Sequence, residues 1–332
     1  MSVVHAPAAG APAVNTPGVG AAGASPAGAS AVGMTAAGPS LQRRIGRRDF
    51  DFSRQVAVMA VINRTPDSFY DHGATFALDR AVAAALQAAD LGADWIDIGG
   101  VPFGRGPAVG VAEEIERVVP VVAAISAARP ELVISVDTNR AVVAERALAA
   151  GAAVINDTSG LADARMAEVV AAGDAHVIIT HSVGPPRAEK PAAQFDDVVA
   201  EVRDFLSGRM VRAERAGVAR ERMIIDPGHD LDKNTLHSLE LTRRLGEIAA
   251  LGVPVLAAVS NKDFIGETLD RPQGRRLPGS LAAMAACVLA GARIVRMHDV
   301  AESVDAVRML EAILGWRAPV RLEHNTHPTH NV

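Results

Sequence analysis

The chain has 332 residues, of which 49% are hydrophobic and 21% are charged, enough for one large globular domain. Its formal net charge of -5 offers no basic surface for nucleic acid, and no apolar run reaches the roughly 20 residues of a membrane-spanning helix. The single cysteine, Cys287, excludes an internal disulfide, which fits a cytoplasmic protein.

The amino-terminal segment differs in composition from the rest of the chain. Its first forty residues are almost entirely Ala, Gly, Pro, Ser, Val and Thr, with no Asp, Glu, Lys or Arg. Frequent Gly and Pro disfavour a helix and small side chains offer no core, so we expect a disordered extension over residues 1–48. The arginine-rich stretch Arg43–Arg48 fits a solvated linker, followed by a folded domain over residues 49–318 and a tail over residues 319–332.

From Val56 onward, short apolar runs alternate with longer helical patterns. Short apolar runs bounded by turn residues are typical of buried parallel strands. The predicted strands are Val56–Ile62, Trp95–Ile98, Leu132–Val136, Ala153–Ile155, His176–Thr180, Met223–Ile225, Val253–Val259 and Arg293–Arg296. The predicted helices are Leu78–Leu91, Ala112–Ala128, Arg140–Ala149, Ala164–Ala171, Asp196–Ala216, Thr235–Ala250, Gly279–Ala290 and Ala301–Leu314.

Eight successive strand–helix units over about 260 residues match a (β/α)₈ TIM barrel in number and size. A doubly wound open sheet is the alternative, but that fold usually carries a glycine-rich phosphate loop after its first strand. The loop here reads Asn63-Arg-Thr-Pro-Asp-Ser-Phe69 and contains no glycine. We therefore predict the barrel, in which the tips of all eight strands face one mouth.

The residues at the predicted strand tips are chemically mixed. In chain order they are Asn63, Gly99-Gly100, Asp137-Thr138, Asn156-Asp157, His181, Asp226-Pro227-Gly228, Ser260-Asn261-Lys262 and Arg296-Met297-His298-Asp299. Two carboxylates and an amide, Asp137, Asp226 and Asn156, suit the donor edge of a neutral heterocycle. A plainer interpretation is that Asp137 or Asp157 caps the following helix and that Asn156 links two loops.

Positive side chains gather at other tips. Lys262, Arg296 and His298 suit a phosphate or pyrophosphate. His181, taken alone, is more typical of a packed loop residue than of a ligand. The sequence has no His-x-x-x-His or cysteine pair for a metal site, and no serine has the context of a catalytic nucleophile.

Together the tip motifs resemble those of dihydropteroate synthase. They are Asn63-Arg-Thr-Pro-Asp-Ser-Phe, Ile96-Asp-Ile-Gly-Gly, Ile134-Ser-Val-Asp-Thr, Ile155-Asn-Asp-Thr-Ser-Gly, Ile225-Asp-Pro-Gly and Arg296-Met-His-Asp-Val. The resemblance implies a pterin-binding (β/α)₈ barrel. That enzyme condenses 6-hydroxymethyl-7,8-dihydropterin pyrophosphate with 4-aminobenzoate, giving 7,8-dihydropteroate and pyrophosphate in folate biosynthesis.

By this resemblance, the pterin would bind inside the barrel. Asp137, Asn156 and Asp226 would hydrogen-bond the edge of the pterin ring. Lys262 would reach the ring carbonyl and a ring nitrogen.

The same resemblance places the pyrophosphate at the cationic tips. Arg296 and His298 would hold this leaving group, and Asn63 would contact a Mg²⁺ ion bound to it. Loss of pyrophosphate leaves a cationic pterin methylene, so positive charge here stabilises the departing group. Lys262, Arg296 and His298 are the catalytic residues that the resemblance implies.

The departures from the family fall in the loops that would surround the aminobenzoate. The second loop, which begins Gly99-Gly-Val-Pro-Phe103, replaces the family's Gly-Gly-Glu-Ser-Thr-Arg-Pro-Gly. Asp263 stands where the family has a serine near the aminobenzoate carboxylate. The diverged aminobenzoate region comprises Arg64, Phe69, Phe103, Arg105 and Asp263.

This divergence bears on the expected activity. Asp263 should repel the carboxylate of 4-aminobenzoate by about 1–4 kcal/mol, and Asn261 removes a guanidinium that the family has there. The pattern resembles the second, diverged dihydropteroate synthase of actinobacteria. We therefore expect a dihydropteroate synthase homologue whose activity is weak or lost.

Two alternatives remain open, and the assembly is a further expectation. One alternative is a non-catalytic paralogue that binds pterin or pyrophosphate. The other is a folate-dependent methyltransferase, which needs a corrinoid-binding partner. The family pairs its last helices, so we expect a homodimer through Gly279–Ala290 and Ala301–Leu314.

Overall fold

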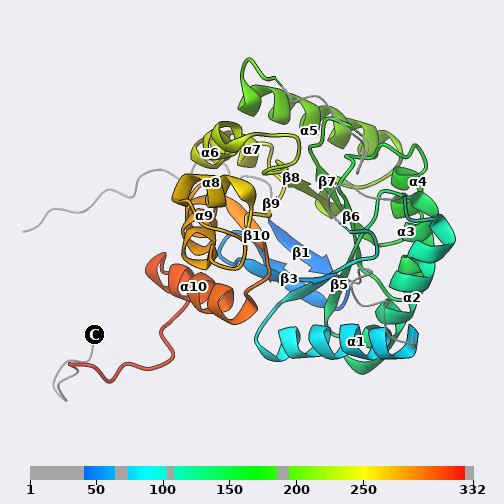
Figure 1. Cartoon of the computed structure of the whole chain (residues 1–332), viewed down its shortest axis with the longest axis horizontal. Coiled ribbons are helices and arrows are strands. Elements are labelled where there is room, and N and C mark those ends of the chain that lie inside the picture. The colour runs from blue at the N-terminus through cyan, green and yellow to red at the C-terminus, as the bar shows by residue number, and fades with distance from the viewer. Residues whose placement is uncertain (1–40, 64–73, 103–107, 185–193, 326–332) are drawn as a thin grey trace, which may run out of the picture. The chain divides into compact units, whose positions relative to one another are not determined.

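The computed structural model describes residues 41–63, 74–102, 108–184 and 194–325 (Figure 1). The predicted site residues Arg64, Phe69, Phe103 and Arg105 lie outside the described residues. The site is therefore built from the strands and from the loops that are described.

Eight parallel strands close into a barrel, which confirms the predicted (β/α)₈ architecture (Figure 1). They are β3 (Ala57–Asn63), β4 (Trp95–Gly99), β5 (Val133–Asp137), β6 (Val154–Asp157), β7 (His176–Thr180), β8 (Met223–Asp226), β9 (Val255–Ala257) and β10 (Ala292–Met297). Successive strands are neighbours, and β10 closes the ring against β3, with Ile294 opposite Ala57. The carboxyl ends of all eight strands therefore share one end of the barrel.

Helices surround the barrel (Figure 1). They are α1 (Ala74–Asp90), α2 (Val111–Ala128), α3 (Ala141–Ala149), α4 (Met166–Ala171), α5 (Val198–Arg215), α6 (Thr235–Arg243), α7 (Leu245–Ala249), α8 (Asp263–Leu269), α9 (Leu277–Leu289) and α10 (Val300–Ile313). The helix predicted over Thr235–Ala250 is divided at Arg244. Helix α8 was not predicted, because its seven residues are too few to show an apolar period. None of the helices described is long and apolar enough to cross a membrane.

An antiparallel hairpin precedes the barrel. Strand β1 (Gln42–Ile45) pairs with β2 (Arg48–Asp51), and Gly46 in the turn has a φ of +57°. The expectation of disorder up to residue 48 is therefore wrong from Gln42 onward. The physical reason is the buried face of the hairpin, to which Ile45 and Phe50 contribute and on which Phe52 continues.

The strands separate two apolar clusters, one inside the barrel and one between the strands and the helices. In the interior cluster, the hairpin residues Ile45, Phe50 and Phe52 pack with side chains from the strands. The strand side chains are Ala57, Met59, Trp95, Val133, Val154, Ile178, Ile224, Leu256 and Ile294. Phe50 and Trp95 meet edge to face, with ring centroids 5.7 Å apart. Side chains therefore fill the amino-terminal half of the barrel.

On six of these strands, the residue two positions after the apolar interior side chain is polar. Alternate residues of a strand face the same side, so these positions also point into the barrel. They are Asp97, Ser135, Asn156, Thr180, Asp226 and Arg296, which are buried or nearly so. We call these six residues the polar layer.

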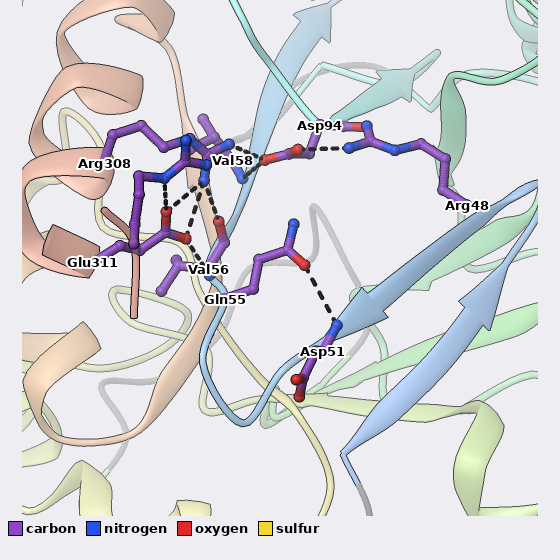
Figure 2. Close-up of polar contacts among 9 residues, drawn as sticks. Arg48, Asp51, Gln55, Val56, Val58, Asp94, Arg308 and Glu311 are labelled. Carbon is purple, nitrogen blue, oxygen red and sulfur yellow. Dashed lines mark hydrogen bonds and ion pairs between the residues drawn. The ribbon is translucent and has the colours of Figure 1, made fainter. Parts of the chain in front are cut away.

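A buried ion-pair network joins the hairpin to the amino-terminal end of the barrel (Figure 2). The Asp94 carboxylate accepts hydrogen bonds from Arg48 Nη2 and Arg308 Nη2, each at 2.9 Å, and from the Val58 N–H at 3.0 Å. Arg308 on α10 also pairs with Glu311 at 3.1 Å. Arg48, predicted to be a solvated linker residue, is thus an anchor of the hairpin.

Candidate active site

A buried ion pair crosses the polar layer from β10 to β4. Arg296 Nε donates to Asp97 Oδ2 at 2.6 Å, and Asn156 Nδ2 donates to the same oxygen at 3.1 Å. Asp97 is fully buried, so Arg296 supplies the positive charge that such a carboxylate needs. Asp97 is absent from the predicted site residues, although a carboxylate inside an apolar strand is a signal that could have found it.

Asp137, at the end of β5, lies beside this ion pair. Arg296 Nη2 is 3.4 Å from Asp137 Oδ2. Burial, and then the negative charge of Asp97, raises the pKa of Asp137 to about 7. Asp137 does not cap the next helix, whose N-cap is Arg140. A carboxyl group that titrates near neutral pH can accept a hydrogen bond from a ring N–H or donate one to a ring nitrogen.

Asp226 ends β8 on the other side of the barrel interior. Its Oδ1 accepts a hydrogen bond from the Gly228 N–H at 2.7 Å, and burial raises its pKa. Gly228 has a φ of +70°, and a Cβ there would lie 2.2 Å from the His181 carbonyl oxygen, so only glycine fits. The Asp-Pro-Gly turn thereby holds the Asp226 carboxylate at the strand tip.

Lys262 follows β9 and precedes α8. Burial lowers the pKa of Lys262, an effect opposed first by the negative charge of Asp230. The charges of Arg296 and Asp226 also act on Lys262. Lys262 therefore shares the electrostatic environment of the polar layer.

His298 lies just beyond the end of β10. Its ring Nδ1 is 3.0 Å from Ser260 Oγ, which also accepts from the His298 backbone N–H at 3.1 Å. Burial, followed by the charge of Arg296, lowers the pKa of His298. Ser260 thus orients an imidazole close to the Arg296 guanidinium.

Four buried polar atoms of the polar layer have no hydrogen-bond partner among the residues that the structure describes. They are Asp97 Oδ1, Ser135 Oγ, Asn156 Oδ1 and Thr180 Oγ1. Buried polar groups are nearly always paired, so their concentration in one layer indicates a site for a polar ligand. Two are acceptors and two are hydroxyls that both accept and donate, which matches a ligand rich in N–H groups.

Asp157 and His181, two other residues at the strand tips, contact the loops around them. Asp157 Oδ1 accepts from the Ser159 N–H at 2.8 Å, which ties the loop after β6. His181 packs edge-on against Phe205, with centroids 4.7 Å apart, and its Nδ1 is 2.8 Å from Lys233 Nζ. Burial, and then the charge of Lys233, lowers the pKa of His181 to about 3. The interpretation of His181 as a packed loop residue is therefore confirmed.

Arg276 forms an ion pair with Asp263, the first residue of α8. Its Nη1 donates to Asp263 Oδ1 at 2.8 Å and to the Asn261 carbonyl at 3.0 Å. Asp263 therefore has a counter-ion that the sequence did not reveal, whereas its expected repulsion of 4-aminobenzoate stays a prediction. Arg276 was missed because it lies 13 residues beyond Asp263 in the chain.

Asn63 is the last residue of β3 and lies opposite Gly99 of β4. Its position at the mouth is thus fixed by the strand register. Five of the predicted site residues lie in the carboxyl-terminal ends of strands: Asn63, Asp137, Asn156, Asp226 and Arg296. His298 comes immediately after β10, and Lys262 immediately before α8.

The barrel and its polar layer define a class of protein. A sequence profile described as "Pterin binding enzyme" matches residues 59–298, which is more than half of the chain. The chain therefore belongs to the family of pterin-binding enzymes.

Within that family, the chain is a dihydropteroate synthase homologue. It is 45% identical over 269 residues to a Mycobacterium tuberculosis protein named inactive dihydropteroate synthase 2, covering 80% of this chain and 85% of the relative. It is 40% identical over 267 residues to the dihydropteroate synthase of Escherichia coli, covering 80% and 94%. The predicted likeness to the diverged actinobacterial paralogue is confirmed.

Solved structures of dihydropteroate synthases share this fold. The Xanthomonas albilineans enzyme with 4-aminobenzoic acid has a TM-score of 0.77 and 39% identity, covering 83% of this chain and 98% of that one. The same enzyme in complex with 7,8-dihydropteroate has a TM-score of 0.74 over 82% of this chain. The barrel described above is thus the fold on which these relatives hold their ligands.

Proposed function

We propose that this protein binds 6-hydroxymethyl-7,8-dihydropterin pyrophosphate and that its transfer to 4-aminobenzoate is weak or lost. The observation that carries the proposal is the convergence of Asp137, Asn156 and Asp226 inside the barrel, next to Arg296. Three acceptor side chains suit the amino and ring N–H groups of a pterin. Lys262 would hydrogen-bond the ring carbonyl. A cytoplasmic location fits this substrate and the single buried thiol, Cys287.

The anionic end of the substrate would lie at the mouth, beside Arg296 and His298. We propose that Asn63 would help to hold a Mg²⁺ ion bound to the pyrophosphate, because an amide side chain offers an oxygen ligand. The donor set fits, because Mg²⁺ commonly binds through substrate phosphates and one or two protein oxygens. The described part of the chain holds no group of three or more His, Cys, Asp or Glu side chains that could hold a metal ion. When bound, the ion neutralises the charge of the pyrophosphate.

In the transfer itself, the bond between the pterin methylene carbon and the pyrophosphate oxygen breaks. A new bond forms from that carbon to the amine nitrogen, which then releases a proton to water. Arg296 and His298 hold the leaving pyrophosphate, which takes the bonding electron pair. Asp137, Asn156 and Asp226 keep the methylene in line with the incoming amine.

Replacing Asp226 with asparagine should weaken pterin binding by about 1.5–3 kcal/mol, the contribution of a hydrogen bond to a charged group. The measurement is calorimetric titration with 6-hydroxymethylpterin. Asp270→Asn is the matched control, because Asp270 is exposed at the end of α8. Equal pterin affinity in the wild type and Asp226→Asn would refute the pterin site.

Pyrophosphate should bind more weakly when salt is added or when EDTA removes Mg²⁺, because the proposed contacts are largely ionic. Calorimetric titration with pyrophosphate measures both effects. The control ligand is 6-hydroxymethylpterin, whose affinity should not respond to EDTA. A pyrophosphate affinity that is insensitive to EDTA would contradict the magnesium proposal.

A second candidate function is a non-catalytic pterin-binding paralogue. The names of the mycobacterial relatives, inactive dihydropteroate synthase 2, favour it. Release of pyrophosphate from the pterin substrate in the presence of 4-aminobenzoate separates the two candidates. Turnover supports the synthase, whereas tight pterin binding without turnover supports the paralogue.

We propose that the protein is a homodimer that pairs through α9 and α10. Three large apolar side chains are exposed there: Leu289 (63%), Met309 (60%) and Ile313 (66%). The double substitution Met309→Glu with Ile313→Glu should convert a dimer into a 34.4 kDa monomer in light scattering. Leu236→Glu is the control, since Leu236 is 74% exposed and belongs to α6 rather than to α9 or α10. A wild-type mass of one chain at micromolar concentration would refute the dimer.

A further inference from the structure

Two buried hydroxyl groups of the polar layer have no role in the function proposed above. Ser135 on β5 and Thr180 at the end of β7 are both fully buried. Neither Ser135 Oγ nor Thr180 Oγ1 has a hydrogen-bond partner among the residues that the structure describes. Because burying a hydroxyl without a partner costs free energy, two of them in one layer indicate that a ligand supplies the missing contacts.

The strand register places each hydroxyl beside a carboxylate of the polar layer. Ser135 lies opposite Asp97 on β4, and Thr180 lies opposite Asp226 on β8. Asn156 lies on β6, which is the strand between β5 and β7. The two hydroxyls therefore belong to the same wall of the barrel as the acceptor groups that the pterin would meet.

The other two unpaired atoms of this wall, Asp97 Oδ1 and Asn156 Oδ1, only accept hydrogen bonds. The amide of Asn156 is oriented by its Nδ2, which donates to Asp97 Oδ2 at 3.1 Å, so its oxygen is the atom left for a ligand. A pterin offers N–H groups to such acceptors, but its rings also contain nitrogen atoms that accept. Of the four unpaired atoms, only the two hydroxyls can donate to those nitrogens.

We propose that Ser135 and Thr180 are specificity-determining residues whose hydroxyls donate hydrogen bonds to ring nitrogens of the bound pterin. The inference rests on the proposed function and extends it. Lys262 would serve the ring carbonyl and the nitrogen next to it, N5, which leaves N1 and N8 of an oxidised pterin without a donor. Two hydroxyls are present for these two nitrogens. The site therefore selects a fused heterocycle whose buried edge carries bare nitrogens beside its N–H groups.

Two ligands that differ at one ring position test the proposal. In 8-deazapterin a C–H group replaces the N8 nitrogen of pterin, and the two dissociation constants are measured by calorimetry on the full chain. The wild type should bind pterin about three- to tenfold more tightly than 8-deazapterin, the effect of one neutral hydrogen bond. In the double variant Ser135→Ala with Thr180→Val, this preference should fall below about twofold, because the hydroxyl donors are gone.

Urea denaturation of the unliganded double variant separates a binding role from a structural one. Neither hydroxyl has a partner to lose in the described part of the chain, so the urea midpoint should equal or exceed that of the wild type. A structural role would instead lower the midpoint and weaken the binding of both ligands by the same factor. That outcome would overturn the proposal.

Two single variants are the matched controls, and both should keep the wild-type preference. Thr180→Ser retains the hydroxyl, whereas Thr268→Val removes a hydroxyl on α8 that donates to the Phe264 carbonyl at 2.6 Å. Equal affinity of the wild type for pterin and 8-deazapterin, or an unchanged preference in the double variant, would overturn the proposal. Failure of the proposed function is distinguished in the first titration: the wild type would then bind neither ligand, and both proposals would fall.

Discussion

Replacing Asp94 with alanine should lower the free energy of unfolding by about 3–4 kcal/mol, measured by urea denaturation. The substitution removes one carboxylate that serves two guanidinium groups and a backbone N–H (Figure 2). Breaking a buried pair costs more than the pair contributes, because the remaining charges lose their partner. Arg48 and Arg308 stay 33% and 22% exposed, so the loss should fall in the lower part of the range for buried pairs.

The matched control is Asp49→Ala in the same hairpin. Asp49 pairs with Arg44 at 2.7 Å, but the two side chains are 75% and 61% exposed. Water screens such a pair, so this loss should stay below about 1 kcal/mol. Similar losses for Asp94→Ala and Asp49→Ala would contradict the structural role of the Asp94 network.

Replacing Arg296 with methionine should have two effects. Folding stability should fall by about 3–5 kcal/mol, because Asp97 stays fully buried without its counter-ion. Pyrophosphate affinity should fall as well, by about 1.5–3 kcal/mol for each charge-assisted hydrogen bond that is lost. Urea denaturation measures the first effect and calorimetric titration the second.

A double variant separates the two effects. Combining Asp97→Asn with Arg296→Met removes both buried charges, so most of the lost stability should return while pyrophosphate binding remains weak. A double variant no more stable than Arg296→Met would show that the Asp97 charge is not what destabilises the single variant. Recovery of pyrophosphate binding would remove Arg296 from the anion site.

The eight-strand barrel could be predicted from the sequence because its signals are local. Each strand is a short apolar run, and helix ends such as Gly92 and Gly291 have positive φ angles, +97° and +115°. Polar residues at the ends of most of these runs mark the mouth without any knowledge of long-range contacts. For the same reason, Asp137, Asn156 and Asp226 could be found from the sequence.

The features that escaped prediction depend on contacts between distant segments. The hairpin was not predicted because Arg43 and Arg48 indicate a solvent-exposed segment. The burial of Arg43 and the pairing of Arg48 with Asp94 can be seen only in the three-dimensional structure. Likewise, no local sequence pattern predicts that the Asp230 carboxylate accepts a hydrogen bond from the first residue of α8, 33 residues further along the chain. The sequence shows which charged residues are present, but it does not show which residues they pair with in the folded chain.

The hairpin also has a kinetic consequence. Ile45, Phe50 and Phe52 pack with the interior apolar cluster at the amino-terminal end of the barrel, so ligands reach the polar layer from the opposite end. We therefore expect ordered binding: a ligand that contacts Asp97 and Asn156 should bind before a second ligand nearer the carboxyl ends of the strands, and should dissociate after it.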